Sequence, residues 1–123
     1  EVIYEGDEIV CEVFKQDLIK LFQNLIINGI KYTEKDVKPI LIVEGKEKLD
    51  HYFFSVKDNG IGIAEEHFDK IFEVFQRLHT RDQYSGTGIG LSYCKKVVEL
   101  HNGEIWLESK MGEGSTFYFK IPK

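Results

Sequence analysis

Apolar positions along the chain recur with two different periods, one typical of helices and one typical of strands. Apolar residues three or four positions apart predict helices over residues 15–33 and 89–100, and a further helical stretch over residues 64–78. The apolar stripe of the first helix consists of Leu18, Phe22, Leu25, Ile26 and Gly29. In the helix over residues 89–100, the expected inward side chains are Leu91, Cys94, Val97 and Val98. In the stretch over residues 64–78, they are Phe68, Ile71, Phe72 and Phe75.

Short alternating runs bounded by turn residues predict six strands: residues 2–4, 9–13, 40–44, 51–58, 104–109 and 115–121. Gly6 and Asp7 are the predicted turn between the first two, and the remaining four make two hairpins. Gly103 is placed to cap the helix that precedes it. We expect Trp106 and Phe117 to lie in the core.

The order of these elements predicts an α+β protein, built as a two-layer α/β sandwich. Helices would cover one face of a mixed, mostly antiparallel sheet. The chain has 123 residues, of which 42% are hydrophobic, and this suffices for a single domain over residues 1–123 with one core.

Charge and cysteine content narrow the class of protein. The formal net charge of −5 argues against a nucleic-acid partner or contact with an anionic membrane. Cys11 and Cys94 lie far apart without a CxxC spacing, so we expect buried free thiols. There is no signal peptide and no apolar run of about 18 residues, which favours a soluble, cytoplasmic domain. Because the chain begins in strand-like sequence, we expect it to be a piece of a longer protein.

A run of alternating glycines, Gly86, Gly88 and Gly90, leads directly into the helix predicted over residues 89–100. A glycine loop at a helix N-terminus offers free N–H groups and suits phosphate. The spacing GxGxG matches neither a P-loop nor a dinucleotide-binding fingerprint. By itself the run is a weak signal, and a tight entry from a loop into a helix is the more common explanation.

Asn24, Asn28 and Lys31 lie within about 40° of one another on a polar side of the first helix. Asparagine is unfavourable inside helices, so two of them one turn apart need a reason. One interpretation is a solvated face. The other is a wall facing a ligand, where amide oxygens suit a hard cation such as Mg²⁺ and lysine suits phosphate.

Asp58 stands at the end of a predicted strand and is followed by Gly60 and Gly62. The sequence Asp-Asn-Gly is a turn signal, and a turn is one explanation. The other is that the strand delivers a carboxylate, with space beside it for a flat ring. An ionised carboxylate accepts hydrogen bonds, so it would favour an amino-purine over an oxo-purine.

Four segments in this order resemble the catalytic and ATP-binding domain of a sensor histidine kinase. That domain has the Bergerat fold of the GHKL superfamily (gyrase, heat-shock chaperone, histidine kinase, MutL). Residues 23–33, 58–63, 71–78 and 86–91 resemble the N, G1, F and G2 boxes of that family. The stretch over residues 76–81 and the C-terminal hairpin look most like soluble kinases of the phytochrome-like or PAS-linked kind. Gly29 departs from the pattern, because the family usually has alanine there.

The resemblance implies roles for individual positions. Asn28 would coordinate Mg²⁺ with support from Asn24, Lys31 would pair with phosphate, and Tyr32 would stack near adenine. Asp58 would accept the adenine amine. The remaining residues implied in nucleotide binding are Gly60, Gly62, Ile63, Arg77, Gly86, Thr87, Gly88, Ile89, Gly90, Leu91 and Thr116. Arg81 matches the lid of the family only loosely, as does Arg77.

The implied activity is transfer of the γ-phosphoryl group of ATP, with Mg²⁺, to a histidine. None of His51, His67, His79 and His101 has the sequence context of a phosphoacceptor. The acceptor would therefore lie on an upstream dimerisation domain of the same protein, and a response regulator would be an indirect partner. Such a domain supplies positioning, a metal and charge stabilisation rather than a nucleophile.

Three other functions share this fold. An ATPase of the gyrase, MutL or chaperone branch has glutamate at the position of Asn24, where it activates water. A Ser/Thr kinase of the anti-sigma type would phosphorylate a protein serine. A catalytically silent nucleotide-binding module would only regulate a partner.

Overall fold

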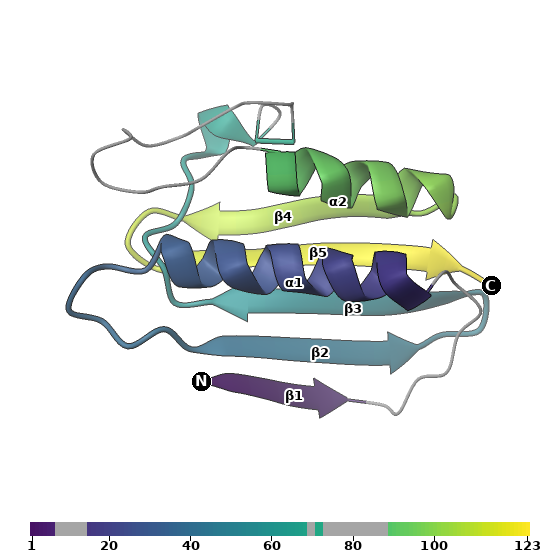
Figure 1. Ribbon diagram of the computed structural model, residues 1–123, viewed down its shortest axis with the longest axis horizontal. Coiled ribbons are helices and arrows are strands. Elements are labelled where there is room, and N and C mark those ends of the chain that lie inside the picture. The colour runs from purple at the N-terminus through teal and green to yellow at the C-terminus, as the bar shows by residue number, and fades with distance from the viewer. Residues whose placement is uncertain (7–14, 69–70, 73–88) are drawn as a thin grey trace.

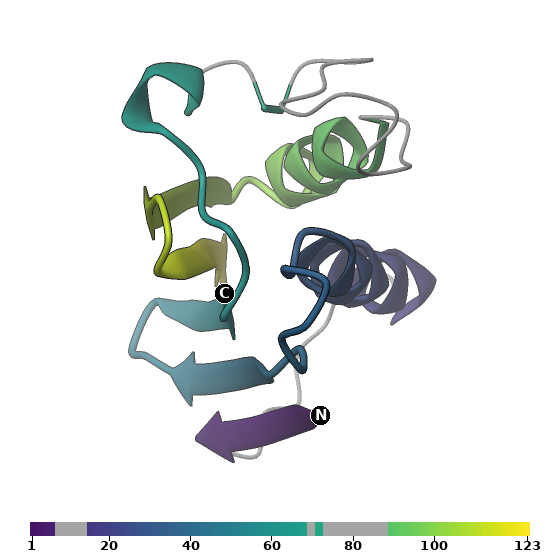
Figure 2. The same cartoon turned by 90° about the vertical axis from the view of Figure 1, so that its left-hand side faces the viewer.

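The computed structural model describes residues 1–6, 15–68, 71–72 and 89–123. In this part of the chain, a five-stranded sheet carries two α-helices on one face (Figures 1 and 2). The strands stand in the order β1-β2-β3-β5-β4, and their bounds are Val2–Gly6, Leu41–Glu47, His51–Asp58, Glu104–Lys110 and Gly114–Pro122 for β1 to β5. The predicted α+β sandwich is confirmed.

Hairpin pairing dominates the sheet. β2 pairs antiparallel with β3, and β4 with β5, as the two predicted hairpins require. β3 also pairs antiparallel with β5, which joins the two hairpins. β1 instead pairs parallel with β2, from Val2 opposite Leu41 to Gly6 opposite Gly45. Alternation predicted a strand here but could not give its partner, which lies about 40 residues along the chain. The predicted strand over residues 9–13 lies outside the described residues, as does Cys11.

The helices α1 (Lys15–Lys31) and α2 (Ile89–Leu100) follow the predicted periodicity, and α1 ends two residues before the predicted boundary. They pack together over the sheet: the thiol of Cys94 contacts the carbonyl of Leu21 at 3.8 Å. The buried core between the layers contains Leu21, Leu25, Leu41, Val56, Val98, Phe117 and Phe119. Burial raises the pKa of the Cys94 thiol to about 12, so Cys94 is the expected buried free thiol.

The end of α2 differs from the predicted glycine cap. Asn102 takes the left-handed conformation, with φ 63°. The Asn102 N–H bonds the carbonyl of Glu99 at 2.9 Å, and the Gly103 N–H bonds that of Val98 at 2.9 Å, so the two satisfy carbonyls of the last turn. Gly103 is needed for another reason, since a Cβ there would lie 2.1 Å from the Lys120 carbonyl oxygen.

The face of the sheet away from the helices carries an aromatic cluster of Phe53, Trp106 and Tyr118. The rings of Trp106 and Tyr118 stack with their centroids 5.6 Å apart, and Phe53 lies 6.0 Å from Trp106. The prediction that Trp106 lies in the core is therefore wrong, whereas Phe117 is buried as expected. In β4 the inward side chains are those of Ile105 and Leu107, so alternation turns Trp106 outward.

Only part of the helical stretch predicted over residues 64–78 is described. A short 3₁₀-helix, η1 (Glu65–His67), begins it, and Ile71 is buried in the core. Phe68 and Phe72 pack against this core, as predicted, whereas Phe75 lies outside the described residues. No helix within the described ranges has both the length and the apolar character needed to cross a membrane.

Candidate nucleotide site

Asp58 is the charged residue among the buried polar side chains of the described structure. It ends β3, and only 9% of its surface is exposed. Its Oδ1 accepts hydrogen bonds from the backbone N–H of Gly60 at 2.9 Å and of Ser115 at 3.1 Å. Both donors fall on one oxygen, so the described residues leave Oδ2 without a hydrogen bond. Oδ2 is therefore the atom that can accept a hydrogen bond from a ligand.

Burial raises the pKa of the Asp58 carboxyl, while the bonds from Gly60 and Ser115 act in the opposite direction. Those two N–H groups favour the ionised form, in which both oxygens accept hydrogen bonds. A buried carboxylate with one oxygen held by the backbone has little freedom to turn. It is therefore oriented before any ligand arrives.

Three glycines allow the close approaches around this carboxylate. Gly29 of α1 lies above Asp58: an added Cβ would be 3.1 Å from the Asp58 Cβ and 2.6 Å from a methyl of Leu41. At Gly60, an added Cβ would lie 2.6 Å from the Tyr32 carbonyl oxygen. Gly62 has φ +82°, and a Cβ there would lie 2.2 Å from the Lys110 carbonyl oxygen. Gly29 therefore brings the last turns of α1 against the carboxylate.

The turn between β4 and β5 is tied to the segment that follows Asp58. The hydroxyl of Ser109 accepts a hydrogen bond from the Ile63 N–H at 2.7 Å and donates to the carbonyl of Gly114 at 3.0 Å. It also lies 2.7 Å from the hydroxyl of Ser115. A hydrogen-bond chain thus runs from Ile63 through Ser109 to Ser115, and the N–H of Ser115 bonds Asp58.

The polar side of α1 faces α2. Tyr93 of α2 donates a hydrogen bond to Asp17 at 3.4 Å, and Asn24, Asn28 and Lys31 follow Asp17 at helical spacing on the same side. α1 extends beyond the first turn of α2 towards the end of the sheet where β3 finishes (Figure 1). Asn24 and Asn28 are half-buried and Lys31 is exposed. Asn28 adjoins Gly29, which packs against Asp58, so this polar side and Asp58 lie at the same end of the sheet.

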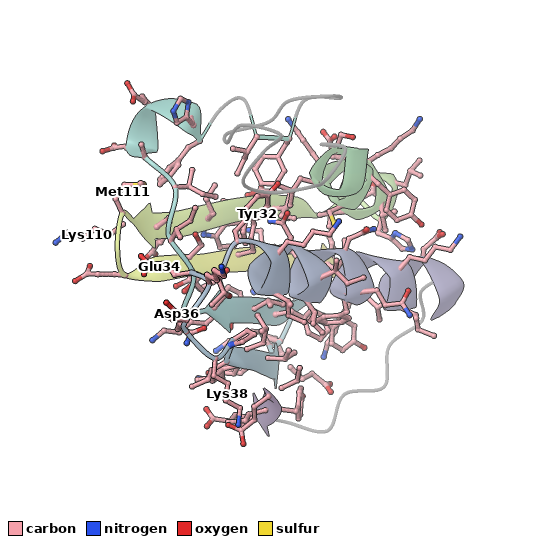
Figure 3. The ribbon with its side chains drawn as sticks, turned by 60° about the vertical axis from the view of Figure 1, so that its left-hand side comes forward. Tyr32, Glu34, Asp36, Lys38, Lys110 and Met111 are labelled. Carbon is pink, nitrogen blue, oxygen red and sulfur yellow. The ribbon has the colours of Figure 1, made fainter. Side chains whose placement is uncertain are left out.

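Tyr32 and the segment after it border the same end of the molecule. Tyr32 is half-buried, and its carbonyl oxygen accepts the Ile61 N–H at 2.8 Å. Figure 3 shows Tyr32, Glu34 and Asp36 close to the end of α1, with Lys110 and Met111 on the neighbouring turn. Asp58, Gly60, Gly62, Lys31 and Tyr32 were all predicted to share one site, and the structure brings them to one end of the sheet.

Several predicted site residues fall elsewhere or cannot be placed. Arg77, Gly86, Thr87 and Gly88 lie outside the described residues, as do Arg81 and His79. Ile89 and Gly90 form the start of α2, and Leu91 packs against the core. Ile63 is buried beside the β4–β5 turn.

Thr116 lies on the face of the sheet that points away from Asp58. Its neighbours Ser115 and Phe117 are buried on the helix side of β5, so alternation turns Thr116 to the open face, as it does Tyr118. The structure therefore places Ser115, and not Thr116, beside the carboxylate.

Ser109, Ser115 and Asn59 are the polar residues of this end that sequence reasoning missed. Asn59 follows Asp58 directly, and its carboxamide bonds the backbone of Lys38 and Ile40. The turn sequence Asp-Asn-Gly was a signal for a special position, but it gave no indication of the partners.

Within the described residues, the oxygens that α1 offers to a cation at this site are amide oxygens. The described residues contain no cluster of three or more His, Cys, Asp or Glu side chains that could hold a metal ion. Near the carboxyl end of α1, the oxygen donors on its polar side are the neutral amides of Asn24 and Asn28, because Asp17 lies in the first turn and accepts the Tyr93 hydroxyl. A hard cation bound there would need further oxygens, such as those of a phosphate ligand.

Comparison with known proteins identifies the family of this chain. Residues 15–123 match the family described as histidine kinase-, DNA gyrase B-, and HSP90-like ATPases. The chain is 57% identical over 105 residues to the phytochrome-like protein Cph1 of Synechocystis sp.; the match covers 85% of this chain and 14% of that protein. The chain thus spans about one seventh of the length of this relative.

Two solved structures share the fold over the whole chain. The catalytic domain of histidine kinase ThkA, in a nucleotide-free form, is 29% identical with a TM-score of 0.83 and is covered over 80% of its length. Histidine kinase ThkA in complex with response regulator protein TrrA is 28% identical with a TM-score of 0.77, and 34% of that chain is covered. The resemblance stated from the four boxes, including its phytochrome-like character, is confirmed.

Proposed function

The chain belongs to the family of histidine kinase-, DNA gyrase B-, and HSP90-like ATPases, and on that premise we propose that it is the ATP-binding catalytic domain of a histidine kinase. It binds ATP with Mg²⁺ and donates the γ-phosphoryl group to a histidine on a separate dimerisation domain. A response regulator then receives the phosphoryl group from that histidine.

The orientation of Asp58 carries the proposal. Its Oδ1 is held by two backbone N–H groups, so Oδ2 is available to an exocyclic amine such as that of adenine. The close packing at Gly29 and Gly60 fixes α1 and the segment after β3 beside this carboxylate. A guanine would instead present a carbonyl oxygen to the carboxylate, which repels it.

The phosphates would extend from adenine along the polar side of α1. Asn28, supported by Asn24, would hold Mg²⁺ by its amide oxygen together with phosphate oxygens. Lys31 would offset phosphate charge. The metal supplies charge stabilisation during phosphoryl transfer, and the protein supplies positioning, since no nucleophile of its own is required.

Nucleotide titration by calorimetry tests the proposal directly. ATP and ADP should bind, and GTP should bind at least about tenfold more weakly because one charged hydrogen bond is replaced by a repulsion. Mg²⁺ should tighten ATP more than ADP, since it bridges to the outer phosphates. Equal affinity for ATP and GTP would contradict the role given to Asp58.

Asn24 separates a kinase from an ATPase of the gyrase, MutL or chaperone branch. An asparagine amide cannot take a proton from water, so this chain alone should turn over ATP only very slowly. Steady hydrolysis that is abolished by Asn24→Ala would favour the ATPase. Addition of a dimerisation domain with labelled ATP should label its histidine, whereas a silent module would leave it unlabelled and a Ser/Thr kinase would label serine.

The partner domains are inferred from the relatives. ThkA was solved in complex with a response regulator, and this chain corresponds to a seventh of a phytochrome-like protein. We therefore assign the phosphoacceptor histidine to another part of the parent protein. In the described chain, His51 pairs with Asp50 at the far end of the sheet from Asp58, which makes it a poor acceptor.

A further inference from the structure

We propose that Asn59 is a positioning residue of the nucleotide site: its side chain clamps the segment between α1 and β2 onto the turn that carries Asp58. The inference rests on the proposed function, because its measured consequence is the affinity for adenine nucleotides. Asn59 itself would not touch the nucleotide. It would act through Tyr32 and Lys31, whose position relative to Asp58 it holds.

Both polar atoms of the Asn59 side chain are used by the backbone of one segment. Its Oδ1 accepts the Ile40 N–H at 2.8 Å, and its Nδ2 donates to the Lys38 carbonyl at 3.0 Å. Pro39, between them, has no N–H to offer. The last paired residues of the β2–β3 ladder are Leu41 and Asp58. The carboxamide therefore continues the ladder by one more step after the backbone pairing has ended.

A second set of contacts ties the other end of this segment to the same turn. The Tyr32 carbonyl accepts the Ile61 N–H at 2.8 Å. Gly60 approaches the same carbonyl so closely that a Cβ would lie 2.6 Å from the oxygen. Residues 32–40 are thus held at one end by the backbone of Ile61 and at the other by the side chain of Asn59. Between these ends, Glu34 to Lys38 are exposed.

This arrangement links Asn59 to ligand affinity. Asp58 is oriented by Gly60 and Ser115, whereas Tyr32 and Lys31 belong to α1 and to the segment that follows it. Removing the clamp at residues 38 and 40 would let that segment move, and its ordering would then have to accompany ligand binding. Pre-ordering raises affinity because the entropy lost in ordering the segment no longer reduces the free energy of binding. Asn59 therefore belongs to the site although both of its polar atoms point to the protein.

The experiment compares the 123-residue chain with its Asn59→Ala variant by nucleotide titration and by amide hydrogen exchange, well below the melting temperature. Asn59→Ala should weaken ATP and ADP binding about tenfold, the effect of losing one to two hydrogen bonds, and should speed exchange of the Ile40 amide. Asn59→Asp keeps the acceptor for Ile40 but not the donor to Lys38, so its loss of affinity should be smaller. Glu47→Ala, which removes a contact at the far end of β2, is the matched control and should leave affinity unchanged.

Linkage provides a test on the unmodified chain, which does not depend on any variant folding. If an ordered segment favours nucleotide binding, then saturating ATP must slow exchange of the Ile40 amide by a matching factor. A purely structural role for Asn59 would give no such response. The coupling should disappear in Asn59→Ala.

The possible outcomes distinguish a failure of this inference from a failure of the proposed function. A tenfold loss in Asn59→Ala together with ATP-dependent protection of Ile40 supports the clamp. Unchanged ATP affinity in a folded Asn59→Ala variant, or an Ile40 amide that is indifferent to ATP while ATP binds, overturns the clamp and leaves the proposed function standing. Failure of the unmodified chain to bind any adenine nucleotide overturns the proposed function, and the clamp with it.

Discussion

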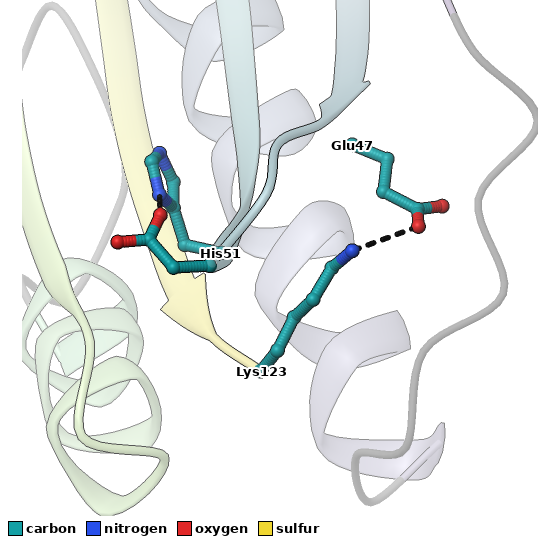
Figure 4. Close-up of polar contacts among 4 residues, drawn as sticks. Glu47, His51 and Lys123 are labelled. Atoms are coloured by element: carbon teal, nitrogen blue, oxygen red, sulfur yellow. Dashed lines mark hydrogen bonds and ion pairs between the residues drawn. The ribbon is translucent and has the colours of Figure 1, made fainter.

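The two ends of strand β3 are held by different kinds of interaction. At the Asp58 end, a carboxylate that is 9% exposed accepts two backbone N–H groups, and glycines bring neighbouring chains into close contact. At the His51 end, polar side chains meet in contact with solvent: His51 pairs with Asp50 at 2.6 Å, and Lys123 with Glu47 at 2.8 Å (Figure 4). The Asp50 side chain is 86% exposed. Water competes for every contact at the second end but for few at the first.

This difference shows which end of the sheet has the more tightly fixed backbone and side chains. Exposed ion pairs contribute little to stability and are readily exchanged. Buried hydrogen bonds and left-handed backbone positions are costly to alter, and they concentrate beside functional groups. The Asp58 end carries both, which is the pattern expected of a binding site. Substitutions at the two ends should therefore differ in size and in what they affect.

The largest loss of stability is expected from Gly62→Ala. The residue has φ +82°, and a Cβ would lie 2.2 Å from the Lys110 carbonyl oxygen, so the segment after Asp58 must move away from the β4–β5 turn. We expect the free energy of unfolding to fall by about 3 kcal/mol, the sum of backbone strain and a steric clash. Urea denaturation measures it.

Gly112→Ala is the matched control for this substitution. Gly112 has nearly the same φ, +85°, but nothing lies within 4 Å of the position that its Cβ would take. Only the conformational strain should remain, about 1 kcal/mol. Equal losses in the two variants would show that the close approach to Lys110 contributes nothing.

Asp58→Asn should separate binding from stability. The amide oxygen can still accept the Gly60 and Ser115 bonds, but the charge that favours the adenine amine is lost. ATP affinity should fall by about tenfold to a hundredfold, equivalent to about 1.5–3 kcal/mol for a hydrogen bond to a charged group. Unchanged affinity would remove Asp58 from the site. Calorimetric titration at neutral pH gives the answer.

The same variant has an expected pH signature in stability. Burial raises the folded-state pKa of Asp58 above its ordinary value of 3.8. Its contribution to stability is therefore fully present below the unfolded pKa and is lost as the pH rises through the raised pKa. At neutral pH the charge is a cost, so Asp58→Asn should be at least as stable as the unmodified chain. The difference should vanish below about pH 3.8, and a less stable variant at pH 7 would contradict this sign.

Ser109→Ala tests the hydrogen-bond chain of the β4–β5 turn. It leaves the Ile63 N–H without its acceptor and removes the neighbour of the Ser115 hydroxyl. We expect a loss of about 1.5 kcal/mol in the free energy of unfolding. Thr116→Val removes a hydroxyl from the residue that follows Ser115, on the open face of the sheet, and should cost less. The reverse order would show that the inner face of the turn is not the constrained one.

Helical periodicity and hairpin alternation sufficed to predict most of the fold. They gave α2 and β3 with their observed bounds, and the two hairpins, because these features depend on residues close in sequence. The parallel partner of β1 is set by distant residues. Trp106 and Thr116 were misplaced for one shared reason: a strand with aromatic or small residues on both faces does not reveal which face the helices cover.

Candidate site residues could be predicted where the residue type alone suggests a role, such as a carboxylate at a strand end or glycines beside it. Asp58, Gly60, Gly62, Lys31 and Tyr32 were identified in sequence and lie at one end of the sheet. The positions of Asn59, Ser109 and Ser115 in the network could not be predicted. Each of the three has a partner 19 to 57 residues away, and an asparagine or serine in a turn has many local explanations.

The smallest effect is expected from Glu47→Ala at the far end of the sheet. Lys123 keeps its hydrogen bond to Glu47 at 2.8 Å in a solvated setting, and that bond raises the pKa of the Lys123 ammonium. The contribution is present below the unfolded pKa near 10.5 and is lost as the pH rises through the raised value. The melting temperature at pH 7 should change by less than about 2 °C, and less still in high salt, because exposed pairs are screened. A larger shift, or any loss of ATP affinity, would mean that the charged end of β3 is coupled to the Asp58 end. The two ends of β3 would then not differ in the way that their solvent exposure predicts.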